Sequence, residues 1–220
     1  MRGVSTSDVE AEGVSRRYGR RWALVDVSLS VAKGEVMMLA GRNGSGKTTL
    51  LRILATAIRP DVGTARVAGF DVVREREDVR LASAVVGHYS YLYEALTARE
   101  NLAVLGRDEI EATLERVGLA ARANDAVATF SAGMRKRLSL ARLLLQKPRV
   151  AFVDEPYSQL DPEGFALVDD VVREMQRGGA TVVMATHQLA RGAQLASQSV
   201  VLKDGRVTWR GAAKDTPEWS

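Results

Sequence analysis

Hydrophobic and polar residues alternate with a period of two in the N-terminal part of the chain. The alternation is weak over residues 9–15, which predicts an edge strand, and residues 16–21 follow as a polar turn. Over residues 24–31 the alternation is regular and predicts a half-buried strand. Its more polar face carries Leu24, Asp26, Ser28 and Ser30, and its apolar face carries Val25, Val27, Leu29 and Val31.

Short unbroken apolar runs take over further along the chain. They predict buried strands over residues 36–40, 81–87, 149–153 and 180–185, and a short strand over residues 65–67 follows a turn at residues 60–64. Segments with helical spacing follow several of them, at residues 49–55, 162–176 and 188–197, and residues 199–202 and 206–209 form a hairpin. Alternating strands and helices indicate an α/β fold with a mostly parallel sheet and helices on both faces. Residues 71–78 are charged and suit a solvated helix or loop, and the last ten residues suit a tail.

A helical block without strand signals separates the two halves of this pattern, at about residues 89–146. Thr97 with Glu100 three residues later has the form of a capping box, and a second amphipathic helix over residues 108–117 ends at Gly118. Ser131 begins a third helix, and Asp161 with the following proline begins the helix after the block. We therefore expect one domain over residues 1–220, with this block as a small helical lobe inserted in the core.

Composition limits the kinds of protein that the chain can be in three ways. The chain has 220 residues, 46% of them hydrophobic, so it can bury a sizeable core, and it has no cysteine for disulfide or thiolate chemistry. Its arginines are dispersed and only 5% of its residues are aromatic, so the net charge of +4 indicates a solvated surface rather than a nucleic-acid partner. No apolar signal-peptide core or membrane span is present, so we expect a soluble chain whose membrane role, if any, depends on a partner.

The most informative segment is residues 41–48, between the predicted strand at residues 36–40 and the helix that follows. It fits G-x-x-x-x-G-K-[ST] at every fixed position, in the strand–loop–helix context of a phosphate-binding loop. Glycines let successive N–H groups surround a phosphate, and the helix N-terminus adds positive potential. Lys47 is expected to reach the β- and γ-phosphates, and the Thr48 hydroxyl to bind Mg²⁺. The loop consists of Gly41, Arg42, Asn43, Gly44, Ser45, Gly46, Lys47 and Thr48, with Thr49 next to it.

Two adjacent carboxylates end the predicted strand at residues 149–153. Asp154 is placed to hold Mg²⁺, and Glu155 to polarise a water for attack on a γ-phosphate. Charges at the end of a buried strand need partners or a metal, although a surface Asp-Glu turn is the alternative. His187, at the end of another buried strand, could hydrogen-bond the γ-phosphate, but a lone histidine is more often structural. A helix start rich in small residues, Ser131-Ala132-Gly133-Met134, could grip a phosphate and is weak evidence alone.

Taken together, these motifs resemble the nucleotide-binding domain of ABC transporters over nearly the whole chain, from about Val9 to Arg210. Tyr18 matches the aromatic residue on which adenine stacks, residues 41–48 the Walker A loop, and residues 152–156 the Walker B strand with its catalytic glutamate. Ser131-Ala132-Gly133-Met134 lies where the signature lies, residues 158–161 look like the D-loop, and His187 looks like the switch histidine.

The resemblance implies a P-loop NTPase fold with an antiparallel β subdomain and a helical lobe. It implies an ATPase that uses ATP and Mg²⁺, with Glu155, His187 and Lys47 catalytic, and that drives export through a transmembrane permease. It also implies a second copy of the domain in an ATP-dependent homodimer, in which each site is completed by Ser131, Ala132, Gly133 and Met134 of the other copy. Finally, it implies a peripheral location on the cytoplasmic side of the membrane.

Two departures from the family pattern bear on the finer function. The signature reads Phe-Ser-Ala-Gly-Met instead of Leu-Ser-Gly-Gly-Gln, so Met134 lacks the glutamine amide. His88 stands where the family has the glutamine that touches Mg²⁺ and signals to the membrane subunit, and an imidazole there could still hydrogen-bond or ligate and would titrate near neutrality. The Gly87-His88 pair resembles the haem exporter subunit of cytochrome c maturation, while residues 59–72 resemble drug-exporter ATPases equally well. A non-transport ABC clamp and a regulatory module with little turnover are the remaining alternatives.

Overall fold

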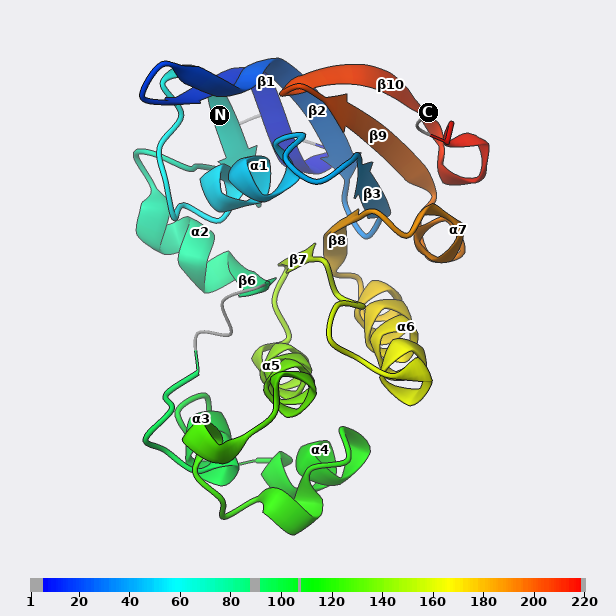
Figure 1. Cartoon of the computed structure of the whole chain (residues 1–220). Helices are drawn as coiled ribbons and strands as arrows, with labels where there is room; N and C mark the ends of the chain where they lie inside the picture. Colours follow the sequence, from blue (N-terminus) through cyan, green and yellow to red (C-terminus); the bar gives the residue numbers. More distant parts are fainter. Residues whose placement is uncertain (1–5, 88–91, 107, 219–220) are drawn as a thin grey trace.

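The computed structural model describes residues 6–87, 92–106 and 108–218 of the chain, and its centre is a six-stranded sheet (Figure 1). Neighbouring strands are parallel from β9 to β6, and only β10 runs antiparallel to its neighbour β9. This arrangement confirms the α/β fold with a mostly parallel core. The order across the sheet is β10 (Arg206–Ala212), β9 (Gln198–Lys203), β3 (Val36–Ala40), β8 (Thr181–Thr186), β7 (Val150–Asp154) and β6 (Ser83–Val86).

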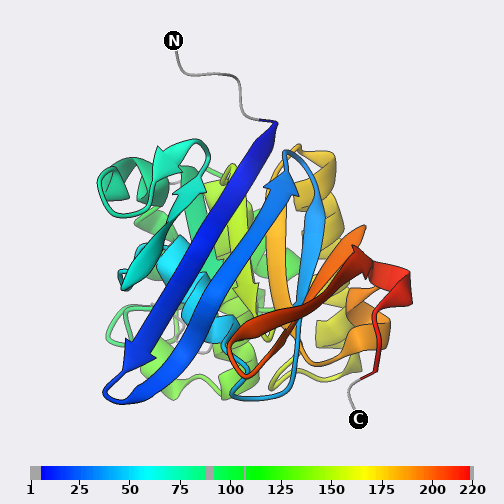
Figure 2. The ribbon, with the colours of Figure 1, turned by 90° about the horizontal axis from the view of Figure 1, so that it is seen from above.

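A second, antiparallel sheet covers one side of the molecule, as Figure 2 shows from above. Helix α1 (Lys47–Leu54) lies between the two sheets, and its Leu50 and Ile53 are fully buried in a cluster that includes Val9 and Phe152. The apolar side chains of α1 therefore pack in a core that both sheets share. The second sheet has the order β2 (Arg21–Ala32), β1 (Ser7–Tyr18), β4 (Val62–Val67) and β5 (Phe70–Asp71), which confirms the antiparallel subdomain.

The structure corrects the prediction for the N-terminal strand. Strand β1 pairs with β2 on one side and with β4 on the other, so it is an interior strand and not an edge strand. The polar turn is also shorter than predicted, since β1 and β2 extend until only Gly19 and Arg20 separate them. Long-range pairing with β4 supplies the hydrogen bonds, which a local pattern of alternation does not reveal.

The regular alternation in β2 changes phase once. Leu24, Val27, Leu29 and Val31 are all buried, although Leu24 was predicted on the more polar face. The change occurs at Asp26, which has a φ of 51° and lies at an irregularity in the pairing with β1. Such a bulge inserts one residue and moves the following side chains to the other face.

The helices on the other face of the parallel sheet share one large apolar cluster with the helical block. Helices α5 (Ala132–Gln146) and α6 (Pro162–Arg177) contribute to it together with α3 (Ala98–Ala103) and α4 (Ile110–Arg116). Three predicted helix starts are confirmed: Thr97 forms a capping box with Glu100, Ser131 accepts from Met134 N, and Asp161 accepts from Gly164 N. The described part of the block contains two further 3-10 turns, Ala120–Arg122 and Val127–Thr129.

Several boundaries differ from the sequence prediction. Leu81 is 86% exposed near the end of helix α2 (Arg76–Ala82), so the strand predicted from residue 81 begins at Ser83. The helix predicted over residues 188–197 is the short α7 (Leu189–Gly192). The C-terminal segment is more ordered than a tail, because β10 is followed by a 3-10 turn (Ala213–Asp215) whose Ala213 is buried. Among the described residues, no helix is both long enough and apolar enough to cross a membrane.

Candidate functional site

The predicted phosphate-binding loop, residues 41–48, connects β3 to α1 in a conformation that its glycines make possible. Gly41 has a φ of 148°, and a Cβ there would lie 2.4 Å from the Leu202 carbonyl oxygen. Gly46 has a φ of 109°, and a Cβ there would lie 2.6 Å from the carbonyl oxygen of Ala23 in β2. The loop is therefore held between β9 and β2, where only residues without a side chain fit.

Lys47 begins α1 and is almost completely buried. Its Nζ donates to the carbonyl oxygens of Gly41 at 2.7 Å and Arg42 at 3.2 Å, so the side chain folds back over the loop. The same Nζ lies 3.6 Å from Glu155 Oε1. The ammonium thus lies between the loop and the end of β7.

Glu155 and His187 meet because their strands are neighbours in the parallel sheet. Asp154 at the end of β7 pairs with Ala185 in β8, so the residues that follow emerge at the same edge. His187 Nδ1 lies 2.8 Å from Glu155 Oε2. Glu155 has a φ of 47°, an unfavourable left-handed conformation that is stored strain of the kind found at functional sites.

Three buried oxygens around this edge lack hydrogen-bond partners in the described part of the chain: Asp154 Oδ1, Glu155 Oε1 and Ser45 Oγ. Burial raises the pKa of Asp154, as does the nearby Glu155 charge, while a hydrogen bond with Thr48 and the charges of Lys47 and Lys136 oppose the rise. Oxygen donors left unsatisfied in this way fit a hard cation such as Mg²⁺. No cluster of three or more His, Cys, Asp or Glu side chains that could hold a metal ion exists among the described residues.

Lys136 is a charged residue of this site that the sequence analysis did not identify. It projects from α5, is 5% exposed, and its Nζ lies 3.4 Å from the backbone oxygen of Asp154. Burial lowers its pKa to about 8, although the charges of Asp154 and Glu155 favour the ammonium. The helical spacing of α5 could have indicated a buried position, but nothing local indicates its partner on β7.

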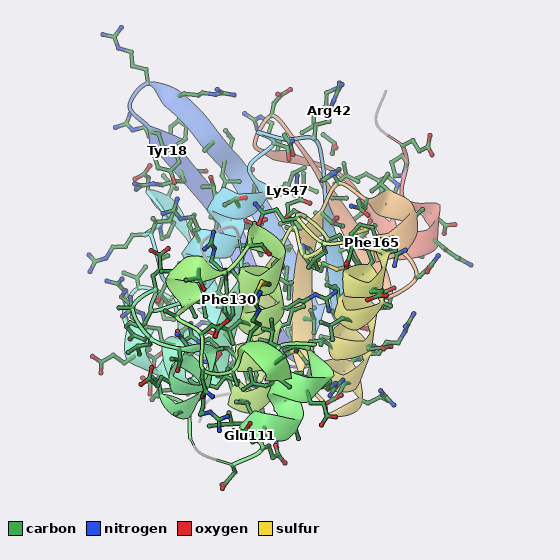
Figure 3. All side chains as sticks on the ribbon, turned by 60° about the horizontal axis from the view of Figure 1, so that its bottom comes forward. Tyr18, Arg42, Lys47, Glu111, Phe130 and Phe165 are labelled. Atoms are coloured by element: carbon green, nitrogen blue, oxygen red, sulfur yellow. The ribbon has the colours of Figure 1, made fainter. Side chains whose placement is uncertain are left out.

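A cavity of about 530 Å³ extends from the loop towards the β1–β2 turn. Tyr18 lies in its wall and is 46% exposed, as an aromatic residue available for stacking must be. Trp22, which was not predicted, is 45% exposed in the same wall. Figure 3 shows Tyr18 near the tip of the β1–β2 hairpin and Lys47 nearer the centre of the molecule. The lining residues are Tyr18, Arg21, Trp22, Ala23, Asn43, Gly44, Gly46, Lys47, Thr48, Thr49, Glu155, Asp204 and Gly205.

A second cavity of about 580 Å³ lies beside the same loop. Gly41, Arg42 and Ser45 line it, together with residues of β9 and of the segment after β10. Asn43 and Gly44 line both cavities, so the loop forms a wall between them.

The helix start Ser131-Ala132-Gly133-Met134 is not brought to this cavity within one chain. None of these described residues lines it, and Figure 3 shows Phe130, directly before them, on the helical lobe. A Cβ on Gly133 would lie 3.0 Å from the Gln159 carbonyl oxygen, so this helix start packs against the loop after β7. His88, predicted to contact Mg²⁺ and ATP, lies outside the described residues.

Comparisons with known proteins agree with one another. Residues 24–158 match the family described as ABC transporter. The chain is 42% identical to the daunorubicin resistance ATP-binding protein DrrA3 of Streptomyces coeruleorubidus, over 96% of this chain and 70% of that protein. It is 34% identical to the ABC transporter ATP-binding protein NatA of Bacillus subtilis, over 93% of this chain and 89% of that protein.

A solved structure described as an ATP-binding subunit of an ABC transporter superimposes with a TM-score of 0.86 at 28% identity, over 94% of this chain and 90% of that one. CbiO1 of Clostridium perfringens, part of an ABC transporter complex, gives a TM-score of 0.80 at 25% identity, over 96% of this chain and 90% of that one. The chain is thus similar to these proteins over nearly its whole length, while it spans only about two thirds of several drug-resistance relatives.

Proposed function

This chain belongs to the ABC transporter ATP-binding family, and from that premise we propose that it is the ATPase subunit of a drug exporter. Subunits of this family bind ATP, hydrolyse it, and work with transmembrane permease partners. The observation that carries the finer proposal is the 42% identity to a daunorubicin resistance ATP-binding protein over 96% of this chain. A relative from Mycobacterium tuberculosis, named for doxorubicin resistance, supports it at 35% identity over 94% of this chain. These relatives favour the drug-exporter alternative over haem export.

Nucleotide would bind in the cavity of about 530 Å³ beside the loop. Adenine would stack on the exposed ring of Tyr18. This contact uses the π-face of the base and does not read its hydrogen-bonding edge. The backbone N–H groups of residues 43–48 and the Lys47 ammonium would hold the triphosphate. Phosphate oxygens would then replace the Gly41 and Arg42 carbonyl oxygens, or share with them, as acceptors for Lys47 Nζ.

Thr48 and Asp154 would hold Mg²⁺, directly or through water, because Asp154 has an oxygen without a partner in the described structure. When bound, the cation neutralises charge on the phosphate oxygens. His88 stays a predicted further ligand.

Glu155 would orient the attacking water, and His187 would contact the γ-phosphate. The hydrogen bond between Glu155 Oε2 and His187 Nδ1 leaves Oε1 for the water, since Oε1 has no hydrogen-bond partner among the described residues and lies 3.6 Å from Lys47 Nζ. Attack forms a bond from the water oxygen to the γ-phosphorus as the bond to the β-phosphate oxygen breaks, releasing ADP and phosphate. Catalysis of this kind depends on positioning and electrostatics, which the adjacent ends of β7 and β8 supply.

A second copy of the chain would complete each site. Ser131, Ala132, Gly133 and Met134 lie away from the cavity of their own chain, and Ser131 is exposed at the start of α5. Head-to-tail pairing would bring this segment to the γ-phosphate held by the partner's loop. Hydrolysis would then remove the charge that keeps the pair closed, and opening would move the permease.

Transport in vesicles tests the proposal. The chain is expressed with a candidate membrane subunit encoded next to its gene, and inside-out vesicles are supplied with doxorubicin and ATP–Mg²⁺. We expect ATP-dependent quenching of doxorubicin fluorescence as the drug accumulates, and no quenching with the Glu155→Gln variant. ATP hydrolysis that haemin stimulates and doxorubicin does not would contradict drug export and favour the haem-export alternative.

A further inference from the structure

A carboxylate of α6 that plays no part in the site described above joins the two segments that follow Glu155 and His187. Tyr157, two residues after Glu155, donates its hydroxyl to Asp169 Oδ1 at 2.8 Å. Arg191, four residues after His187, donates from Nη1 to Asp169 Oδ2 at 2.9 Å. Each carboxylate oxygen thus accepts a bond from a different segment, and both segments come directly from the edge where Glu155 meets His187.

The surroundings of this carboxylate restrict its movement. Asp169 is 8% exposed and Tyr157 is 2% exposed. Burial and the hydrogen bond to Asp169 raise the pKa of Tyr157 far above its usual value, so the hydroxyl keeps the proton that it donates. A charged hydrogen bond in a buried setting is stronger and shorter than a neutral one.

Aromatic contacts add to the hydrogen bonds. The Arg191 guanidinium lies over the ring of Tyr157 at 5.4 Å and over the ring of Phe165 at 5.1 Å. The two rings meet edge to face, 5.6 Å apart. Figure 3 shows Phe165 at the end of α6 that is nearest to Lys47, so the contacts lie at the site end of the helix.

The backbone after β7 needs such support. Glu155 and Gln159 both have positive φ, at 47° and 68°, and Tyr157 lies midway between them. Residues with side chains keep such a conformation only where the surrounding structure imposes it. The Ser158 hydroxyl and the Glu155 N–H make backbone hydrogen bonds here, and Tyr157 attaches the segment to α6.

We propose that Tyr157, Asp169 and Arg191 form a positioning brace that keeps the His187 imidazole against the Glu155 carboxylate during ATP hydrolysis. The proposal rests on the roles proposed above for Glu155 and His187. None of the three brace residues lines the nucleotide cavity, so they act through Glu155 and His187 and not on ATP. Loosening the brace should therefore lower kcat and leave ATP affinity unchanged.

The test compares Asp169→Asn with Asp170→Asn. Asp170 is the matched control, since it is the next residue of α6, is 68% exposed, and lies 3.8 Å from Arg173. An asparagine at position 169 keeps the size but loses the charge and one of the two acceptors. Because small misplacements of catalytic groups are costly, we expect kcat to fall by about tenfold or more for Asp169→Asn, with unchanged ATP affinity and kcat unchanged for Asp170→Asn.

A double-mutant cycle separates this brace from a general structural role. In a His187→Ala background the brace has lost one of the groups it positions, so Asp169→Asn should lower the residual rate much less than in the wild type. Equal loss in both backgrounds, or wild-type kcat for Asp169→Asn, would overturn the proposal.

Should Asp169→Asn fail to fold, Tyr157→Phe removes a single oxygen and should still lower kcat severalfold, and an unchanged kcat would count against the brace. Absence of turnover in the wild type would refute the proposed function itself, and the brace with it.

Discussion

Lys136 offers a test of the site's electrostatics that does not depend on activity. Its ammonium is buried under the end of β7, and burial lowers its pKa from the ordinary 10.5 to about 8. In the unfolded chain the same group keeps the ordinary value. Between these two values the unfolded state binds more protons than the native state, so this group makes the native state more stable as pH rises. Below pH 8 both states are protonated and the full cost of burying the charge is present.

The size of the effect follows from the shift. At about 1.4 kcal/mol for each pKa unit, the native state loses about 3 kcal/mol at pH 7 through this lysine. By the same relation most of that loss, about 2–3 kcal/mol, disappears by pH 10, and most of the change occurs above pH 8. A Lys136→Met variant has no such dependence. We therefore expect the free energy of unfolding of the wild type to rise relative to the variant by about 2–3 kcal/mol between pH 7 and pH 10.

Urea denaturation at four or five pH values measures the difference, because titration of all other groups largely cancels between the two proteins. Lys214→Met is the control, since Lys214 is exposed and its replacement should give a difference that is nearly flat with pH. A wild-type-minus-Lys136→Met difference as flat as that of the control would refute the argument that burial governs this lysine.

The remaining predictions concern the dimer, the link between the sheets, and the core. Glu155→Gln should elute as a dimer with ATP–Mg²⁺ in size-exclusion chromatography, and a monomer under those conditions would contradict head-to-tail pairing. Asp8→Ala should lower the free energy of unfolding by about 1–3 kcal/mol in urea, because buried Asp8 accepts from both Arg149 and Thr181, and a loss below 0.5 kcal/mol would count against it. Phe152→Ala should cost about 3–5 kcal/mol, since Phe152 is fully buried in β7, and calorimetry showing an unchanged Tm would contradict that.

Local patterns predicted the centre of the fold well. Strand β3 and the glycine loop were predicted from contiguous residues, because the loop needs its strand and helix directly beside it. The caps at Thr97, Ser131 and Asp161 were also predicted, since each hydrogen bond spans only three residues. Features that depend on distant partners were missed: the interior place of β1 depends on β4, and the phase change of β2 depends on a bulge at Asp26.

In the candidate site, too, residues in local motifs were predicted and contacts between distant residues were not. Lys47, Asp154, Glu155 and His187 were predicted separately, and the parallel order of their strands brings Lys47 and His187 each close to Glu155. Their catalytic roles stay predictions. Charged groups that reach the site from helices could not be predicted, because helical spacing shows that Lys136 faces inward but not which strand end it meets.

The brace shows a further limit of the same kind. Asp169 and Arg191 lie 12 and 34 residues after Tyr157, on two different helices, and the sequence offers no signal that joins them. They meet only in the folded chain, where Asp169 in α6 accepts hydrogen bonds from the segments that follow β7 and β8.

The central claim is that this chain hydrolyses ATP with Glu155 as the group that orients the attacking water. Phosphate release by the purified chain at saturating ATP–Mg²⁺, alone and with its membrane subunit, tests it most directly when ATP binding is measured on the same samples. We predict turnover by the wild type, and for Glu155→Gln a turnover reduced by about 100-fold or more with ATP binding retained. Wild-type phosphate release by Glu155→Gln, or no release by the wild type in either setting, would contradict the claim.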